Sequence, residues 1–268
     1  MKALLRKLVT PAQYDRMSRL KNRFAPDPIF QLTHAPFLII SVLIRLLPSR
    51  SRVAIKSDIK VVRRLDYRPN NILINVDSDF EYRVRLKSCV KEPETVNWIE
   101  TFFQNGQIMY DIGANVGAYS LVASSIFQGK LRVYSFEPAF QNYNQLCKNL
   151  ALNQCRDSVV PLQVALSDRT GIETFNYRNL VPGSGVHALG EPVNHLSQRF
   201  TPILTQPVLS YRADDFIGEF GLPIPNHIKI DVDGSELEIV EGMTAVLDDA
   251  RLKSLMIEKL KCVCGKEV

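Results

Sequence analysis

The residues from Asp111 to Gly117 combine two glycines, an asparagine and a carboxylate within seven positions. An apolar run that begins at Ile108 precedes them, and apolar residues at helical spacing follow them, which predicts a buried strand, a turn and a helix. Neither Gly113 nor Gly117 carries a Cβ, so the backbone of the turn can approach a ligand closely. The amide hydrogens at the start of the helix point toward the same place. The stretch therefore predicts a ligand site.

The spacing of this turn narrows the choice of ligand. It lacks the third glycine of the Gly-x-Gly-x-x-Gly dinucleotide pattern and the Gly-Lys-Ser/Thr ending of a triphosphate site. The carboxylate of Asp111 would repel a pyrophosphate, but it can accept hydrogen bonds from an ammonium group. The turn therefore favours a cationic ligand such as S-adenosylmethionine. The alternative without function is an ordinary strand, turn and helix in which Asn115 is a cap.

A second carboxylate follows the next predicted strand, residues 131–136. Glu137 stands about twenty residues beyond the glycine turn, where a carboxylate can accept hydrogen bonds from both ribose hydroxyls. Further strands are predicted at 159–165, 227–232 and 255–257, with amphipathic helices between them. This alternation predicts an α/β fold with a doubly wound, mostly parallel sheet that binds its ligand at the carboxyl edge.

The segment before the central strand is predicted to hold a hairpin and a helix. Residues 72–76 and 80–86 have the patterns of two strands, the second with one polar face, joined around Asp77-Ser-Asp79. Pro93 can begin a helix whose apolar stripe includes Trp98. We expect Trp98 to belong to the core, because a lone aromatic without a basic cluster is weak evidence for base stacking.

Charge is unevenly distributed along the 268 residues. Residues 1–68 hold 15 Lys and Arg against 4 Asp and Glu, whereas residues 69–268 hold 18 against 24. We therefore predict a basic, largely helical extension over 1–68 and a catalytic domain over 69–268. Residues 14–24 have the pattern of a basic amphipathic helix. The apolar segment 37–47 is too short to span a bilayer. It could lie in a membrane interface, or pack on the catalytic domain or a partner subunit.

The protein is predicted to be cytoplasmic, with peripheral contact of residues 1–68 at the inner membrane face as a further hypothesis. The start of the chain has no cleavage site of the kind that ends a signal peptide. The five cysteines are odd in number, which suits a reducing compartment. Cys262 and Cys264 have no second pair or histidine cluster beside them, so no metal site is expected there.

Four motifs in order resemble one family, the FkbM-type S-adenosylmethionine-dependent methyltransferases. They are Asp111-Ile-Gly-Ala-Asn-Val-Gly117, Phe136-Glu-Pro138, Ala165-Leu-Ser-Asp168 and Ile228-Lys-Ile-Asp-Val-Asp-Gly234 followed by Glu236, and they cover roughly residues 90–260. The resemblance implies the class I methyltransferase fold, a cofactor-binding domain over 69–268, and O-methylation of a hydroxyl on a sugar, glycan, glycolipid or polyketide-like acceptor. It also implies that Ser167 and Asp168 border the adenine, with a solvated turn as the alternative for Asp168.

Two features depart from the family's pattern. The fourth motif usually reads Asp-Val-Glu-Gly, whereas Asp233 replaces the glutamate here. The family fold also continues past its fifth strand into an antiparallel strand pair, for which residues 259–268 are too few. We therefore expect a shortened carboxyl end, a different end, or an N-terminal strand that substitutes at that edge.

Cofactor contacts are assigned to the turn and to the two ribose and adenine motifs: Asp111, Gly113, Ala114, Asn115, Gly117, Glu137, Ser167 and Asp168. Asp231 is the leading candidate to take or orient the acceptor's proton, because it ends the fourth strand. Lys229 lies two residues earlier on the same side of that strand, where it would keep Asp231 ionised or form a structural salt bridge. His187 is the rival base. Asp231, Asp233 and Glu236 could collect a divalent ion, but they follow a strand rather than the helix of an EF-hand, so no metal is assigned.

Alternative functions remain open from the sequence. A nicotinamide-dependent oxidoreductase shares the strand, turn and ribose carboxylate but needs the third glycine. A non-catalytic relic without the last strands would bind cofactor weakly. Nucleic acid is not expected as a partner, because the catalytic part is acidic. The expected partner is a small-molecule or glycan hydroxyl acceptor.

Overall fold

The computed structural model describes residues 40, 43–193 and 198–257 of the 268-residue chain. The chain divides into two compact units, Met1–Lys60 and Val61–Val268. In the first unit the structure describes helix α4 (Ser49–Asp58), all of whose residues are at least partly exposed. The expected helix at 14–24, most of the segment 37–42, and Cys262 and Cys264 lie outside the described residues.

The second unit begins earlier than the division expected after residue 68. Strand β1 (Val62–Arg64) pairs antiparallel with β2 (Leu73–Asn75). The side chains of Leu65 and Tyr67, which follow β1, are buried in the main hydrophobic core. Residues 61–68 therefore fold with the second unit.

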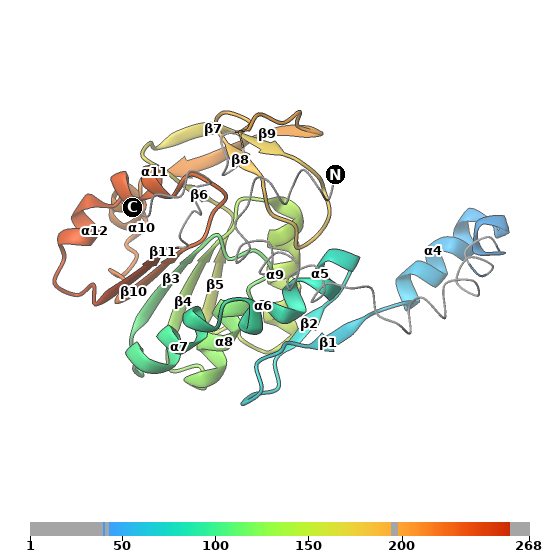
Figure 1. The fold of residues 1–268 in the computed structure, drawn as a ribbon, viewed down its shortest axis with the longest axis horizontal. Helices are drawn as coiled ribbons and strands as arrows, with labels where there is room; N and C mark the ends of the chain where they lie inside the picture. Colours follow the sequence, from blue (N-terminus) through green and yellow to red (C-terminus); the bar gives the residue numbers. More distant parts are fainter. Residues whose placement is uncertain (1–39, 41–42, 194–197, 258–268) are drawn as a thin grey trace, which may run out of the picture. The chain divides into compact units, whose positions relative to one another are not determined.

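A five-stranded parallel sheet forms the centre of the second unit (Figure 1). Its order is β11 (Ser254–Ile257), β10 (His227–Ile230), β3 (Ile108–Ile112), β4 (Arg132–Phe136) and β5 (Val159–Leu162). From β3, the chain first adds β4 and β5 on one side and later adds β10 and β11 on the other side. The direction in which strands are added therefore reverses between β3 and β10. Ligands bind at such a switch point, outside the carboxyl ends of the strands. The predicted doubly wound α/β fold is confirmed.

Apolar side chains cover both faces of this sheet, because successive residues of a strand point to opposite sides. Met109 and Val133 pack into one core with Trp98, whose indole nitrogen donates to Ser254 Oγ at 2.9 Å. Tyr110 and Ile228 pack into a second core on the other face. The expected place of Trp98 in the core is confirmed.

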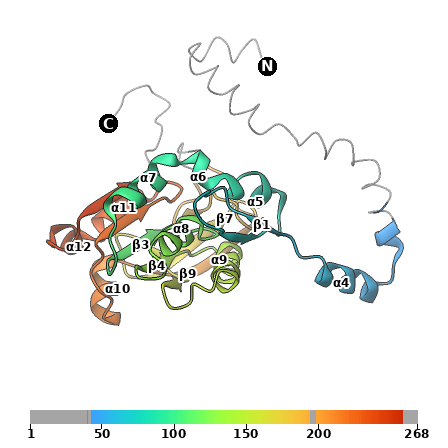
Figure 2. The ribbon, with the colours of Figure 1, turned by 90° about the horizontal axis from the view of Figure 1, so that it is seen from below.

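Helices surround the sheet on both faces (Figures 1 and 2). Those whose side chains enter the first core are α7 (Pro93–Phe102), α8 (Ala118–Ile126) and α9 (Phe140–Leu152). Those that enter the second are α10 (Ala213–Phe220), α11 (Glu236–Glu241) and α12 (Thr244–Asp248). The sequence predicted one helix after β10, but the structure has two, which are separated by Gly242 and Met243. Gly242 lies against the Ser167 carbonyl, so that a Cβ there would be 1.9 Å from its oxygen.

A second, four-stranded sheet is inserted between β5 and β10. Its order is β6 (Ala165–Leu166), β9 (Leu204–Tyr211), β7 (Gly171–Tyr177) and β8 (Ala188–Leu189). It lies over the carboxyl end of the central sheet (Figure 1). The predicted third strand is therefore too long, since β5 ends at Leu162 and Ala165 pairs in the other sheet.

The predicted hairpin strand over 80–86 is wrong. Residues Asp79–Arg83 form helix α5, and a 3-10 turn η1 (Arg85–Lys87) and helix α6 (Ser88–Lys91) follow. Ser78 and Glu81 form a capping box, in which each side chain bonds the other's backbone amide. This pair stabilises a helix start, which explains why the alternating pattern does not become a strand. In the described residues, no helix has the length and apolar character needed to cross a bilayer.

Candidate active site

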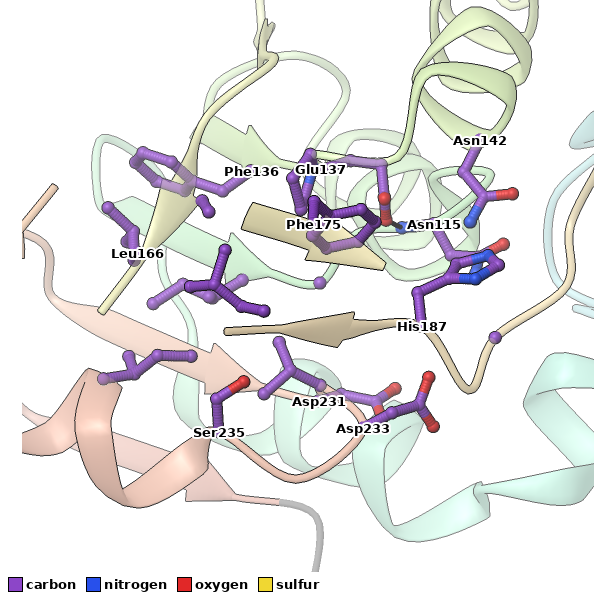
Figure 3. Close-up of a pocket in the computed structure, with 18 of the residues that line it drawn as sticks. Asn115, Phe136, Glu137, Asn142, Leu166, Phe175, His187, Asp231, Asp233 and Ser235 are labelled. Carbon is purple, nitrogen blue, oxygen red and sulfur yellow. Dashed lines mark hydrogen bonds between the residues drawn. The ribbon is translucent and has the colours of Figure 1, made fainter. Parts of the chain in front are cut away.

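A pocket lies at the switch point, beneath the second sheet. Its polar lining comes mainly from the ends of β3, β4 and β10, with Asn115, Glu137, Asp231 and Asp233 gathered toward one end (Figure 3). Its apolar lining comprises Ile112, Phe136, Val164, Ala165, Leu166, Phe175, Leu189, Val232 and Ile239. The pocket therefore offers one end suited to a flat apolar ring and another suited to hydroxyl and charged groups.

The glycine turn is held against the end of β10. Gly113 has φ +80°, and a Cβ there would lie 2.0 Å from the carbonyl oxygen of Asp231. Gly117 has φ +83°, and a Cβ there would lie 2.5 Å from Leu146 Cδ1. Both positions require glycine, because the backbone is left-handed and the space is filled. Other protein atoms therefore already fill the space that a Cβ of either glycine would occupy.

Asn115 and Glu137 are joined at the polar end of the pocket. The backbone amide of Asn115 donates to Glu137 Oε2 at 2.8 Å, and the amide of Ala139 donates to Oε1 at 2.8 Å. Burial raises the pKa of Glu137 to about 7, although these amides oppose the rise. The carboxylate is thus fixed in orientation before any ligand arrives. Ala114, also assigned to the cofactor, uses its amide to bond the Phe136 carbonyl.

A buried ion cluster lies between β3 and β10. Lys229 Nζ is 2.9 Å from Asp231 Oδ2 and 3.8 Å from Asp111 Oδ1. Burial alone would lower the pKa of Lys229, but the two carboxylates raise it above its usual value. Burial raises the pKa of Asp111, which Lys229 and the 2.5 Å hydrogen bond from Ser120 oppose. One ammonium group therefore serves two carboxylates.

The three charged side chains of this cluster differ in whether they line the pocket. Asp231 lines it, and about a quarter of its side chain is exposed (23%). Asp111 and Lys229 are buried and do not belong to the lining. Asp111 therefore holds Lys229 and Ser120 rather than contacting the space directly, and Lys229 can affect a ligand only through Asp231.

The loop Pro182–His187 runs along the pocket. Val186 has φ +64°, a costly backbone conformation for a β-branched residue. Its amide donates to Asp233 Oδ2. Gly185 also contacts this carboxylate, because a Cβ there would lie 2.9 Å from Oδ2. Asp233, the residue that departs from the family's glutamate, thus contacts the loop.

His187 also lines the pocket. Burial lowers the pKa of His187 to about 4, so the ring is neutral near pH 7. The Gln141 amide nitrogen lies 3.0 Å from His187 Nε2. Nδ1 has no hydrogen-bond partner among the described residues. A ring with so low a pKa is a weak proton acceptor near pH 7.

Ser167 and Asp168 lie outside the lining of the pocket. Ser167 is buried against Gly242, and its hydroxyl donates to Asp168 Oδ1 at 3.0 Å. Asp168 also pairs with Arg169. The residues just before them, Ala165 and Leu166, do line the pocket, so this motif reaches the space one or two residues earlier than expected.

Some lining residues carried no recognisable signal in the sequence. Asn142 on α9, and Phe175 and Leu189 on the second sheet, come from segments that have no motif. Within the described chain, no group of three His, Cys, Asp or Glu residues is arranged to hold a metal ion.

Comparison with known proteins assigns the chain to a family. Residues 111–261, more than half of the chain, match the methyltransferase FkbM domain. The protein therefore belongs to the FkbM methyltransferase family, as the four motifs predicted.

Curated relatives match across the same region. A hexuronic acid methyltransferase, AglP, from Haloferax volcanii is 23% identical over 61% of this chain and 61% of its own length. The methyltransferase sdnD from Sordaria araneosa is 30% identical over 50% and 59%, and the 2-O-methyltransferase NoeI from Sinorhizobium fredii is 29% identical over 54% and 60%. The chain thus matches about three fifths of the length of these relatives.

A crystal structure of the FkbM methyltransferase from Methylobacillus flagellatus superposes with a TM-score of 0.42 at 18% identity. It covers 70% of this chain and 46% of that one.

Proposed function

We propose that the protein is an S-adenosylmethionine-dependent O-methyltransferase that acts on a hydroxyl of a sugar, a glycan or a related acceptor. The observation that carries this proposal is Glu137, a carboxylate fixed by two backbone amides at the edge of a pocket with one apolar and one polar end. Membership of the FkbM family supports the reaction class. The relatives named for a hexuronic acid and for 2-O-methylation support a sugar hydroxyl as acceptor.

The lining fits the proposed cofactor. Glu137 would accept hydrogen bonds from the ribose hydroxyls, and Phe136, Leu166 and Ile239 would contact the adenine. The amide oxygen of Asn115 is buried without a hydrogen-bond partner in the described chain, and it could accept a bond from the methionine ammonium group. When bound, the cofactor supplies an electrophilic methyl group.

The chain's own contribution is to align the acceptor and to receive its proton. Asp231 lies at the end of β10 among the polar lining, so its carboxylate is assigned to orient the acceptor hydroxyl and to accept its proton. Lys229 keeps this carboxylate ionised and fixed in direction. His187 is the weaker candidate, because its pKa is far below neutrality.

Calorimetric titration with S-adenosylmethionine and S-adenosylhomocysteine tests the proposal, together with transfer of labelled methyl to extract glycans. We expect both ligands to bind and a labelled sugar product to form. The proposal would be refuted if the protein bound reduced nicotinamide cofactor instead, or if it bound neither S-adenosylmethionine nor S-adenosylhomocysteine.

A further inference from the structure

A second hollow adjoins the candidate cofactor pocket, between helix α5 and residues 178–186. We call it the acceptor groove. Its lining includes Phe80 from α5 and Arg178, Asn179 and Val181 from the facing segment. The groove and the cofactor pocket share Gly185 in their linings. Gly185, in the loop Pro182–His187, therefore borders both spaces and places no side chain in either of them.

The two walls of the groove are fastened to each other. Ser78 Oγ donates to the Pro182 carbonyl at 2.8 Å, and Arg85 Nε donates to the Gly183 carbonyl at 2.6 Å. Gly183, with φ +79°, packs on Glu81 so closely that a Cβ would lie 2.5 Å from Glu81 Cγ.

Glu81 ties this assembly to the core. Its carboxylate is fully buried, accepts from the Ser78 amide at 2.9 Å, and accepts from Gln145 on α9 at 2.8 Å. The groove is therefore preformed, and its α5 wall lies before the segment 111–261 that defines the family.

The chemistry of the lining points to a sugar. Phe80 and Val181 keep 37% and 41% of their surface exposed, which offers an apolar platform to the C–H face of a pyranose ring. Asn179 Oδ1 already accepts from the Val181 amide and the Ser184 hydroxyl, which leaves the NH₂ group of Asn179 beside this platform to donate to hydroxyl groups. An aromatic platform with a few polar groups is the usual makeup of a small-molecule site.

The charge of the lining points to an anionic sugar. Arg178 is exposed and forms no hydrogen bond or ion pair with any described residue. The acidic lining residue, Asp79, is already paired with Arg83. An unpaired guanidinium binds a carboxylate or sulfate with two parallel hydrogen bonds. Arg178 is thus the one charged lining residue of the groove without an ionic partner among the described residues, and its guanidinium is open to an anionic group.

We propose that the acceptor groove binds the methyl acceptor, and that this acceptor is a sugar with a carboxylate or sulfate that pairs with Arg178. The proposal rests on the proposed methyltransferase function. A hydroxyl of the bound sugar would pass beside Gly185 toward Asp231 and Asp233, because Gly185 is common to both linings and contacts Asp233.

The test measures binding of the full chain, with S-adenosylhomocysteine present, to immobilised oligosaccharides in matched pairs that differ only by glucose or glucuronate. We expect at least about tenfold tighter binding to the acidic members. Arg178→Gln should abolish that preference and leave binding to the neutral members unchanged, and Phe80→Ala should weaken both. Arg156→Gln is the matched control, because Arg156 is also exposed and lies between α9 and β5, at the amino end of β5 rather than at the carboxyl end where the pocket lies.

The proposal would be overturned if the chain bound the neutral and acidic oligosaccharides of each pair equally, or if it bound no acidic oligosaccharide. It would also be overturned if Arg178→Gln kept the preference for acidic oligosaccharides. Calorimetry on the same preparations separates this failure from that of the proposed function. A parent chain that does not bind S-adenosylmethionine refutes the methyltransferase, whereas one that binds it without the acidic preference refutes only the groove.

Discussion

Gly113 and Asp231 are in backbone contact across the switch point of the sheet. The two residues follow neighbouring parallel strands, β3 and β10, and the Cβ that Gly113 lacks would lie 2.0 Å from the Asp231 carbonyl oxygen. The turn assigned to the cofactor and the residue assigned to the acceptor's proton are therefore positioned by one contact. A displacement of the backbone at either residue should therefore displace the other, whereas a change confined to the Asp231 side chain need not.

Gly113→Ala should damage both stability and cofactor binding. Alanine is strained at φ +80° and its methyl group would displace the end of β10. We expect a loss of about 2 kcal/mol or more in the free energy of unfolding, measured by urea denaturation, and at least about tenfold weaker calorimetric binding of S-adenosylmethionine. Gly171→Ala is the control, because a Cβ at Gly171 meets no described atom within 4 Å. A Gly113→Ala variant as stable as the control would contradict the packing.

Affinity for the cofactor should depend on pH through Glu137. Its pKa of about 7 means that the free protein is partly protonated at neutral pH. Ribose hydroxyls donate to the ionised carboxylate, so calorimetric affinity should increase as the pH rises from about 6 to about 8. Glu137→Gln should bind more weakly at the upper end and show a flat dependence over the same range. A parent curve that is equally flat would remove Glu137 from the ribose contact.

The same carboxyl group should lower stability as the pH rises. Its pKa is raised on folding from 4.5 to about 7, so its stabilising contribution is complete below about pH 4.5 and is lost as the pH passes 7. Compared with Glu137→Gln, the parent should lose on the order of 3 kcal/mol in the free energy of unfolding across this interval. Parallel urea denaturation curves at each pH measure the difference, and a constant difference would show that Glu137 has an ordinary pKa.

Histidine titrations should reveal two buried neutral rings. Burial lowers the pKa of both His187 and His227 to about 4. Neutral histidine contributes stability above the unfolded pKa of about 6.5, and this contribution is lost as the pH falls toward 4. Proton NMR titration, with assignments from His187→Gln and His227→Gln, should give midpoints near 4. A midpoint near 6.5 for His187 would return it as a candidate base.

The glycine turn and the strand ends were predictable from the sequence because their chemistry is local. Gly113, Glu137 and Asp231 each follow a short apolar strand, and parallel strands bring their carboxyl ends to one edge. The burial of Asp111 and Lys229 was not predictable. It depends on how β3 and β10 pair, with Lys229 opposite Asp111 in the register.

The second sheet was not predicted, for a different reason. Strand β7 pairs along its length with β9, which begins 27 residues after β7 ends. No short turn joins these strands, and their alternation is weak, since Phe175, Asn176 and Tyr177 are all buried in succession. Helix α5 was not predicted, because residues 80–86 alternate like a strand, whereas the Ser78–Glu81 capping box favours a helix start.

The last prediction separates the roles of Asp231 and Lys229. Asp231→Asn keeps nearly the same size at a partly exposed position, so folding and cofactor affinity should stay close to the parent values. Turnover should nevertheless fall by about 100-fold or more, as expected when a general base is removed. Single-turnover methyl transfer to an identified acceptor, with calorimetry and thermal unfolding on the same variant, measures all three.

Lys229→Met should give the opposite pattern. It removes the ammonium group that lies between two carboxylates and leaves Asp111, which is 1% exposed, as a buried charge without its cation. Loss of one partner of a buried pair costs about 3–5 kcal/mol, so we expect a large loss of thermal stability before any effect on chemistry. Asp111→Asn in the same background should restore part of this stability, because it removes the uncompensated charge. If Asp231→Asn unfolds the protein while Lys229→Met leaves it stable, the cluster is organised around Asp231 as a structural group, and the proton acceptor must be sought at His187.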